Sequence, residues 1–122
     1  MKKLTVKEEE LMNIFWSHEK LFIREVLEFM PEPKPHFNTV STVVRGLEDK
    51  NYLDHETHGN SHCYYAKISK GNFKELTLKS VVNKYFGNSI FSAVSALVSN
   101  KKLSSEELEE LKELVNNVEK GE

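Results

Sequence analysis

The chain has 122 residues, 39% of them hydrophobic, and a formal net charge of −2, which suits one ordinary core or a small domain with an extension. No run approaches the roughly 18 apolar residues of a membrane span, and the start MKKLTVKEEE turns acidic where a signal peptide would turn apolar, so we expect a cytoplasmic protein. The single cysteine, Cys63, excludes an internal disulfide.

Two helices are predicted at the start of the chain. Thr5 and Glu8 have the T-x-x-E spacing of a capping box, and an apolar face follows, so we expect a helix over 6–17. A second, short helix is predicted over 23–30, where apolar residues recur at helical spacing: Ile23, Val26, Leu27 and Met30. The proline-rich run PEPKP over 31–35 ends it.

The segment HFNTVSTVVRGLEDKNYL, residues 36–53, combines poor helix formers with the apolar spacing of a helix. One stripe is formed at i, i+3, i+4 and i+7 by Val40, Val43, Val44 and Leu47. A third helix is therefore predicted, although its β-branched and hydroxyl residues alone would favour a strand.

A β-hairpin is predicted after this helix. The segments 52–57 and 62–68 flank HGNS, a polar turn whose Gly59 and Asn60 tolerate positive φ. Helix, helix, turn, helix and hairpin is the order of a winged helix-turn-helix, in which the third helix enters the major groove and the hairpin is the wing. The predicted fold class is mainly α with a small β-hairpin.

This order predicts a DNA-binding surface on the third helix and the wing. Small hydroxyl and amide side chains let a helix approach base edges and hydrogen-bond there, and no acidic residue occurs from Pro33 to Leu47, although chance can produce such a window. The candidate contacts are Lys34, His36, Asn38, Thr39, Ser41, Thr42, Arg45, His58 and Asn60.

Two alternatives for the third helix stay open. A buried helix in a small α+β domain could use its Ser and Thr hydroxyls to bond back to its own carbonyls. A winged helix could also serve only protein contacts, and the lack of a strong basic patch in a chain of net charge −2 favours that interpretation.

From Asn72 onward only helices are predicted, and Ser104 and Glu107 form a second capping box. Three amphipathic helices in about 50 residues make a minimal bundle, so we expect a homodimer, with a monomer whose tail folds back as the alternative. The predicted domains are a winged helix over 1–70 and a dimerisation region over 71–122. The expected interface residues are Phe73, Leu76, Val82, Phe86, Phe91, Val94, Leu97, Leu108, Leu111 and Val115.

The chain resembles the BlaI/MecI/CopY family of penicillinase and methicillin-resistance repressors. ELMNIFW over 10–16 matches the family's E-x-M-x-x-x-W first helix, and TVST over 39–42, with Leu47 and Lys50, matches its recognition helix. Tyr64-Tyr65 is similar to the end of the family's wing, and Leu103-Ser104 leads into a similar acidic helix. The resemblance implies a dimeric repressor on a dyad DNA operator, released when a membrane sensor protease triggers cleavage among the C-terminal helices.

The chain departs from the family pattern at three places. Asn51 replaces the usual glycine after Lys50, which is acceptable because Asn also adopts positive φ after a helix. Gly46 stands where many members carry a cation. The Asn-Phe bond cleaved in the best-known members aligns with Ala96-Leu97, the candidate cleavage site here. The C-terminal cysteine pairs of the copper-responsive branch are absent, so copper sensing by that route is not expected.

Catalysis and metal sensing are the remaining alternatives. The chain has no G-x-S-x-G, phosphate-binding loop or dinucleotide fingerprint, so no enzyme is expected. A metal-responsive regulator could use His55, His58, His62 and Cys63. Neighbouring strand residues such as 62 and 63 point to opposite faces, so at most three such ligands converge easily. A solvated wing is favoured, with no cofactor, no metal ligand, and operator binding that needs no metal.

Overall fold

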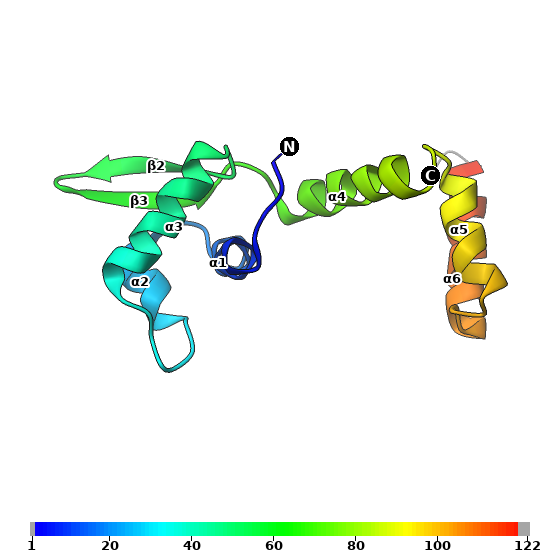
Figure 1. Ribbon diagram of the computed structural model, residues 1–122, viewed down its shortest axis with the longest axis horizontal. Coiled ribbons are helices and arrows are strands. Elements are labelled where there is room, and N and C mark those ends of the chain that lie inside the picture. The colour runs from blue at the N-terminus through cyan, green and yellow to red at the C-terminus, as the bar shows by residue number, and fades with distance from the viewer. Residues whose placement is uncertain (1, 120–122) are drawn as a thin grey trace. The chain divides into compact units, whose positions relative to one another are not determined.

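The computed structural model describes residues 2–119, and the chain divides into two compact units, Met1–Leu76 and Thr77–Glu122. The first unit contains three helices and a three-stranded sheet, and the second contains most of α4 with α5 and α6 (Figure 1). Across residues 2–119, no helix has both the length and the apolar character that crossing a membrane requires. The predicted fold class, mainly helical with a small antiparallel sheet, is confirmed.

Helix α1 (Val6–Trp16) begins at the predicted capping box. The Thr5 side chain accepts a hydrogen bond from the backbone N–H of Glu8, and the Glu8 carboxylate accepts one from the backbone N–H of Thr5. These two bonds satisfy donors that the first turn of a helix leaves unpaired. Leu11, Met12 and Phe15 then point into the core.

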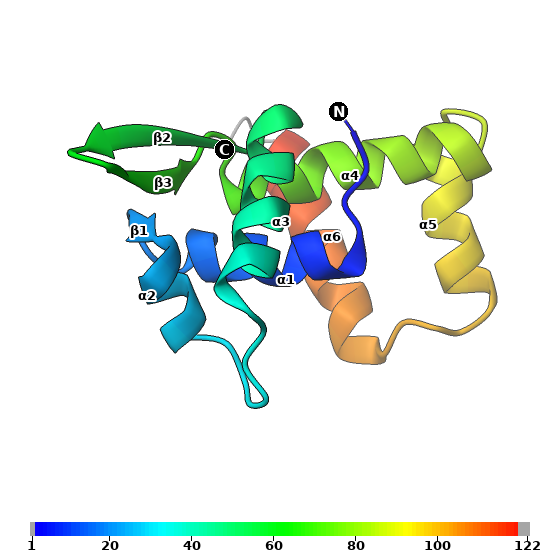
Figure 2. The same cartoon turned by 60° about the vertical axis from the view of Figure 1, so that its left-hand side comes forward.

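The second predicted helix is shorter than expected and follows a strand that the sequence analysis did not predict. Helix α2 (Ile23–Glu28) ends two residues before Met30. Strand β1 (Leu21–Phe22) has only two residues, too few for an alternating pattern to be recognisable, and pairs antiparallel with Cys63 and Tyr64. Figure 2 shows β1 beside α2, leading directly into it.

Helix α3 (Phe37–Asp49) confirms that helical spacing overrides strand propensity in this segment. Val40, Val44 and Leu47 are each no more than 1% exposed. The helix ends in a Schellman arrangement, in which the N–H of Tyr52 donates to the carbonyl of Leu47, and Asn51 adopts the predicted positive φ, 68°.

The predicted wing is a hairpin of β2 (Leu53–His58) and β3 (Ser61–Ala66). The sheet order is β1-β3-β2, with both neighbouring pairs antiparallel. Gly59 occupies the turn at φ 62°, a conformation that glycine adopts without a Cβ penalty.

The core of the first unit extends past the end of the hairpin into the start of α4 (Lys70–Tyr85). Trp16 Nε1 donates to the Ile68 carbonyl at 2.9 Å, and the Phe73 ring lies 5.0 Å from the Trp16 ring and 6.0 Å from the Tyr52 ring, between centroids. Phe73, predicted as a dimer contact, therefore packs against the first unit's own core and is partly buried there.

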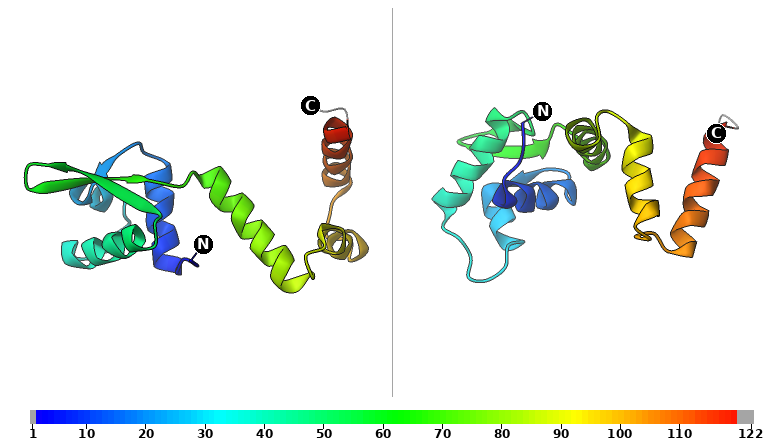
Figure 3. Two further views of the ribbon diagram at one scale, coloured as in Figure 1. Left: turned by 90° about the horizontal axis from the view of Figure 1, so that it is seen from above. Right: turned by 45° about the vertical axis from the view of Figure 1, so that its right-hand side comes forward.

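The second unit contains two further predicted helices, α5 (Ile90–Ser99) and α6 (Ser105–Glu119), and the chain reverses direction between them (Figure 3). The predicted box at Ser104 and Glu107 is present, with both reciprocal hydrogen bonds at 3.0–3.1 Å. Several large apolar side chains are exposed, among them Phe91 at 80%, Ile90 at 70% and Leu114 at 60%.

Candidate nucleic-acid interface

The outer face of α3 is polar and exposed. Asn38, Thr39, Thr42 and Arg45 are exposed, whereas Ser41 is half-buried. Because the buried stripe fixes the rotation of the helix in the unit, these exposed side chains are the ones that a DNA duplex approaching α3 would meet.

The Thr42 hydroxyl bonds back to its own helix, as one of the alternatives for this helix predicted for its Ser and Thr side chains. Its Oγ1 donates to the backbone carbonyl of Asn38 at 2.9 Å. A hydroxyl has one proton and two lone pairs, so Thr42 in this rotamer offers only acceptor capacity to a base edge. Asn38 retains both an amide donor and an amide acceptor.

The start of α3 uses two predicted contacts for local structure. His36 is the N-cap, and its Nδ1 accepts a hydrogen bond from the backbone N–H of Asn38 at 3.1 Å. Lys34 Nζ donates to the carbonyls of Leu27 at 2.7 Å and Glu28 at 3.3 Å, at the C-terminus of α2. The Lys34 cation thus lies where the helix dipole of α2 favours positive charge.

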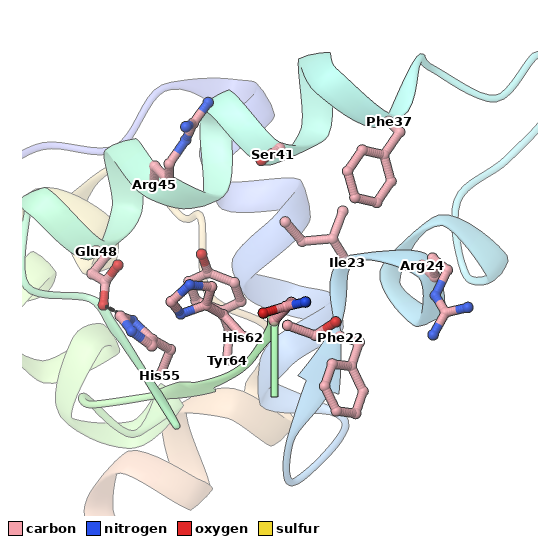
Figure 4. A pocket seen from close by; sticks show the side chains of 12 residues that line it. Phe22, Ile23, Arg24, Phe37, Ser41, Arg45, Glu48, His55, His62 and Tyr64 are labelled. Carbon is pink, nitrogen blue, oxygen red and sulfur yellow. Dashed lines mark hydrogen bonds and ion pairs between the residues drawn. The ribbon is translucent and has the colours of Figure 1, made fainter. Parts of the chain in front are cut away.

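A pocket of about 390 Å³ lies between α3, the wing and the β1–α2 segment (Figure 4). It brings together three predicted contacts from separate elements, Ser41 and Arg45 of α3 and Asn60 of the wing turn. It also contains residues that the predicted site lacked: Phe22, Ile23, Arg24, Phe37, Glu48, His55, Ser61, His62 and Tyr64.

Charges of both signs lie around this pocket. Burial raises the pKa of the Tyr64 phenol, Glu48 raises it further, and Arg45 opposes both effects. Tyr64 therefore stays a neutral hydroxyl, and the cations of Arg45 and Arg24 lie at separate parts of the lining, as Figure 4 shows.

His58 is not part of this group. Its Nε2 lies 3.4 Å from a carboxylate oxygen of Glu56, and its ring meets the ring of Phe22 edge-on at 5.7 Å. The Lys20 ammonium, 2.7 Å from Glu56, and His58 both lower the pKa of that carboxyl. His58 and Asn60 thus have different surroundings although both belong to the hairpin end.

Comparisons with known proteins decide the family. A family model described as "Penicillinase repressor" matches residues 4–117. The chain belongs to the penicillinase repressor family. It is 26% identical over 119 residues to the penicillinase repressor of Staphylococcus aureus, covering 97% of this chain and 94% of that one. It is also 26% identical over 115 residues to the methicillin resistance regulatory protein MecI of S. aureus strain N315, covering 93% and 94%.

A solved relative supports the winged-helix assignment. The solution structure of the DNA binding domain of the repressor BlaI matches with a TM-score of 0.51 and 25% identity, covering 59% of this chain and 93% of that domain. The predicted family resemblance is confirmed. Membership of this family implies DNA-binding transcriptional repression rather than catalysis.

The predicted dimer contacts differ widely in exposure. Val82 is buried at 7%, and Phe86, Val94, Leu108 and Leu111 are half-buried. Four others are exposed: Leu76 at 44%, Phe91 at 80%, Leu97 at 48% and Val115 at 50%. The exposed members are the ones that a second chain could cover.

The candidate cleavage bond lies inside a helix. Ala96 and Leu97 belong to the second half of α5, and the Ala96 carbonyl accepts from Asn100 Nδ2 at 2.8 Å. The Leu97 carbonyl accepts from the backbone N–H of Lys102 at 3.0 Å.

Two exposed pocket residues on the helices, Arg24 and Phe37, were not predicted as DNA contacts. Arg24 lies on α2, outside the acid-free window of 33–47 in which cations were sought, and Phe37 is the first residue of α3 and is 44% exposed. Arg24 could have been identified from its positive charge at a polar position of the second predicted helix. Phe37 offered no such signal, because phenylalanine is usually a core residue.

Proposed function

We propose that the protein is a cytoplasmic, homodimeric transcriptional repressor that binds a dyad DNA operator with α3 in the major groove and the wing beside it. One observation carries the proposal: α3 turns Asn38, Thr39, Thr42 and Arg45 outward, away from the buried side chains of Val40, Val44 and Leu47, and has no acidic residue before Glu48. Amide and guanidinium groups at such positions pair with adenine and guanine edges.

The remaining predicted contacts have supporting roles in this proposal. Ser41 and Asn60 border the pocket between helix and wing, where the duplex backbone would pass. Lys34, His36 and His58 are exposed cations or imidazoles suited to phosphate oxygens. Arg24 joins them as a further phosphate contact. These contacts set the register on DNA, whereas the outward α3 residues select the sequence.

A dimer interface in the second unit supports operator affinity. The chain has a net charge of −2, so we expect only weak electrostatic attraction between one winged helix and the phosphates of a half-site. Linking two such units makes the second contact intramolecular and raises avidity by roughly 10²–10⁴. The apolar side chains of α5 and α6 that stand exposed in the single chain supply the surface for this linkage.

Relief of repression is proposed to follow proteolysis in the second unit, triggered by a membrane sensor protease. A cut at Ala96-Leu97 separates most of α5 from α6 and leaves the first unit intact. Such a cut removes the linkage between two DNA-binding units without touching α3.

The test selects duplexes from a random pool with the full-length protein and then measures affinity for the selected sequence. The expected product is a dyad whose half-site centres lie about one helical turn apart, or a multiple of it. Phe91→Glu, which inserts a charge at the most exposed apolar position of α5, should yield a monomer with operator affinity lowered by roughly 10²–10⁴.

Ser92→Glu is the matched control, because Ser92 is exposed on the polar side of the same helix. It should stay dimeric with unchanged affinity. A selected site without dyad symmetry, or a wild-type chain that sediments as a monomer at micromolar concentration, contradicts the proposal.

A further inference from the structure

Three potential metal ligands meet where the end of α3 approaches the start of the wing. Glu48 lies in the last turn of α3, and Asp54 and His55 lie near the start of β2. Each offers one ligand atom, and these atoms all lie within 4.8 Å of one another. The closest pair, His55 Nδ1 and Glu48 Oε2, is 2.5 Å apart.

A fourth potential ligand, His62, lies beside them on β3. The register pairs His55 with Tyr64 and Thr57 with His62, so His55 and His62 are diagonal neighbours on one face of the hairpin. Their ring centroids are 4.1 Å apart. Glu48, His55 and His62 gather at one end of the pocket, as Figure 4 shows, and the pocket gives an ion a route from solvent.

We propose that Glu48, Asp54, His55 and His62 form a binding site for a divalent transition-metal ion of the zinc class. Imidazole nitrogens with carboxylate oxygens are ligands that zinc accepts, with bonds of about 2.0–2.2 Å. Tetrahedral bonds of that length separate the ligand atoms by roughly 3.3 Å. The His55–Glu48 contact, at 2.5 Å, is shorter than that spacing, so ion binding would widen it.

Charge balance favours a divalent cation at this position. The two carboxylates supply two negative charges, and neutral imidazoles supply lone pairs without further charge. All three clustered side chains are half-buried, so water screens their attraction for an ion less than at a fully exposed site. The positive charge of the Arg45 guanidinium at the same pocket repels a bound cation. An ion that forms directional bonds to imidazole nitrogen is therefore favoured over an ion that is held by charge alone.

No metal ligand was expected here from the sequence, in which only the hairpin histidines and Cys63 stood out as candidate ligands. Two of the four ligands, Glu48 and Asp54, lie outside that run. Cys63 is buried on the opposite face from His55 and His62, and His58 lies at the turn end of β2 beside Glu56, so neither belongs to the site. Asp54 also alternates to that opposite face, but its carboxylate oxygen lies within 4.8 Å of the ligand atoms of Glu48 and His55. A bound ion would join the last turn of α3 to both strands of the wing.

The test titrates the full-length protein with Zn²⁺ in competition with a fluorescent chelator, and with Co²⁺ as a spectroscopic probe. The expected result is one ion per chain, and cobalt absorption bands of a four-coordinate nitrogen and oxygen site without sulfur-to-cobalt charge transfer. His55→Gln, His62→Gln and Glu48→Gln should each weaken Zn²⁺ binding by at least about tenfold, since even residues that only support a ligand cost 10- to 100-fold.

His58→Gln is the matched control, because His58 is an exposed hairpin histidine beside a carboxylate on the other face. It should change Zn²⁺ affinity less than about twofold. His62 is exposed, so His62→Gln tests the site even where His55→Gln perturbs folding. A charge-transfer band from Cys63, an equal loss in His58→Gln, or no saturable binding overturns the proposal.

Discussion

The Glu8 carboxylate accepts a hydrogen bond from the Lys50 ammonium at 2.6 Å, which joins the first turn of α1 to the residue that caps α3. The two side chains are 10% and 25% exposed, and Glu8 also accepts from the backbone N–H of Thr5. Burial alone would raise the pKa of Glu8, but Lys50 and Thr5 outweigh it and hold the pKa below its ordinary value of 4.5.

Glu8→Gln should lower the free energy of unfolding by about 1–3 kcal/mol at neutral pH, because it leaves the Lys50 ammonium without its charged partner. The folded-state pKa of Glu8 is depressed, so its stabilisation is complete above pH 4.5 and is lost as the pH falls through the lower folded value. Urea unfolding at several pH values measures this.

The variant should show a flatter decline in stability below pH 4.5 than the wild type. Glu10→Gln, an exposed change on the same helix, is the control and should retain the wild-type pH profile. Identical profiles for Glu8→Gln and the wild type would refute the coupling.

Gly46→Ala should stabilise the first unit by about 0.5–1 kcal/mol, because glycine inside a helix carries an entropic cost. An added Cβ would meet only Glu8 Oε2, at an ordinary 3.9 Å. Thermal melting should rise by about 2–8 °C. Gly59→Ala is the contrast: Gly59 has a positive φ of 62°, so alanine there should lower the melting temperature.

Local signals predicted most of the fold. The boxes at Thr5 and Ser104, the stripe ending at Leu47 and the Gly59 turn each depend on residues a few positions apart, and each was found where expected. Strand β1 was missed because its identity depends on pairing with residues about 40 positions away. The position of Phe73 in the core likewise depends on Trp16 and Tyr52, which no local pattern reveals.

The candidate site was less predictable than the fold. Helical periodicity identified the face of α3 that carries Asn38 and Arg45. It left open whether hydroxyls such as that of Thr42 bond back to the helix, and it did not reveal that Lys34 binds the end of α2. Those bonds depend on rotamers and on the angle between two helices. The meeting of Glu48 with His55 depends in addition on the path of the chain after α3.

Arg45→Ala should weaken operator binding by about 1–3 kcal/mol and relax base preference at one position, as expected for a guanidinium on a guanine edge. Side-by-side titration of operator and random duplexes measures both effects. Arg24→Ala, assigned to phosphate, should weaken the two duplexes about equally and reduce the salt dependence of binding. Unchanged affinity of Arg45→Ala for both duplexes would remove Arg45 from the interface.

Cleavage at Ala96-Leu97 should require the end of α5 to unwind. Proteases bind substrates as extended chains, whereas here the Ala96 carbonyl is held by Asn100 and the Leu97 carbonyl by Lys102. Asn100→Ala removes the 2.8 Å side-chain bond to Ala96 and should speed proteolysis in the second half of α5. Lys112→Ala, an exposed change on α6, should leave the rate unchanged.

A chain shortened to residues 1–96 reproduces the larger product of cleavage at Ala96-Leu97 and tests what the cut does to DNA binding. This chain retains all of the first unit, including Phe73 between Trp16 and Tyr52, so its winged helix should stay folded and bind a single half-site as before. Without α6 and the end of α5 it should sediment as a monomer and lose roughly 10²–10⁴ in affinity for the full dyad. Equal loss on half-site and dyad would point to damage in the first unit, and undiminished dyad affinity would show that the second unit does not link two DNA-binding units.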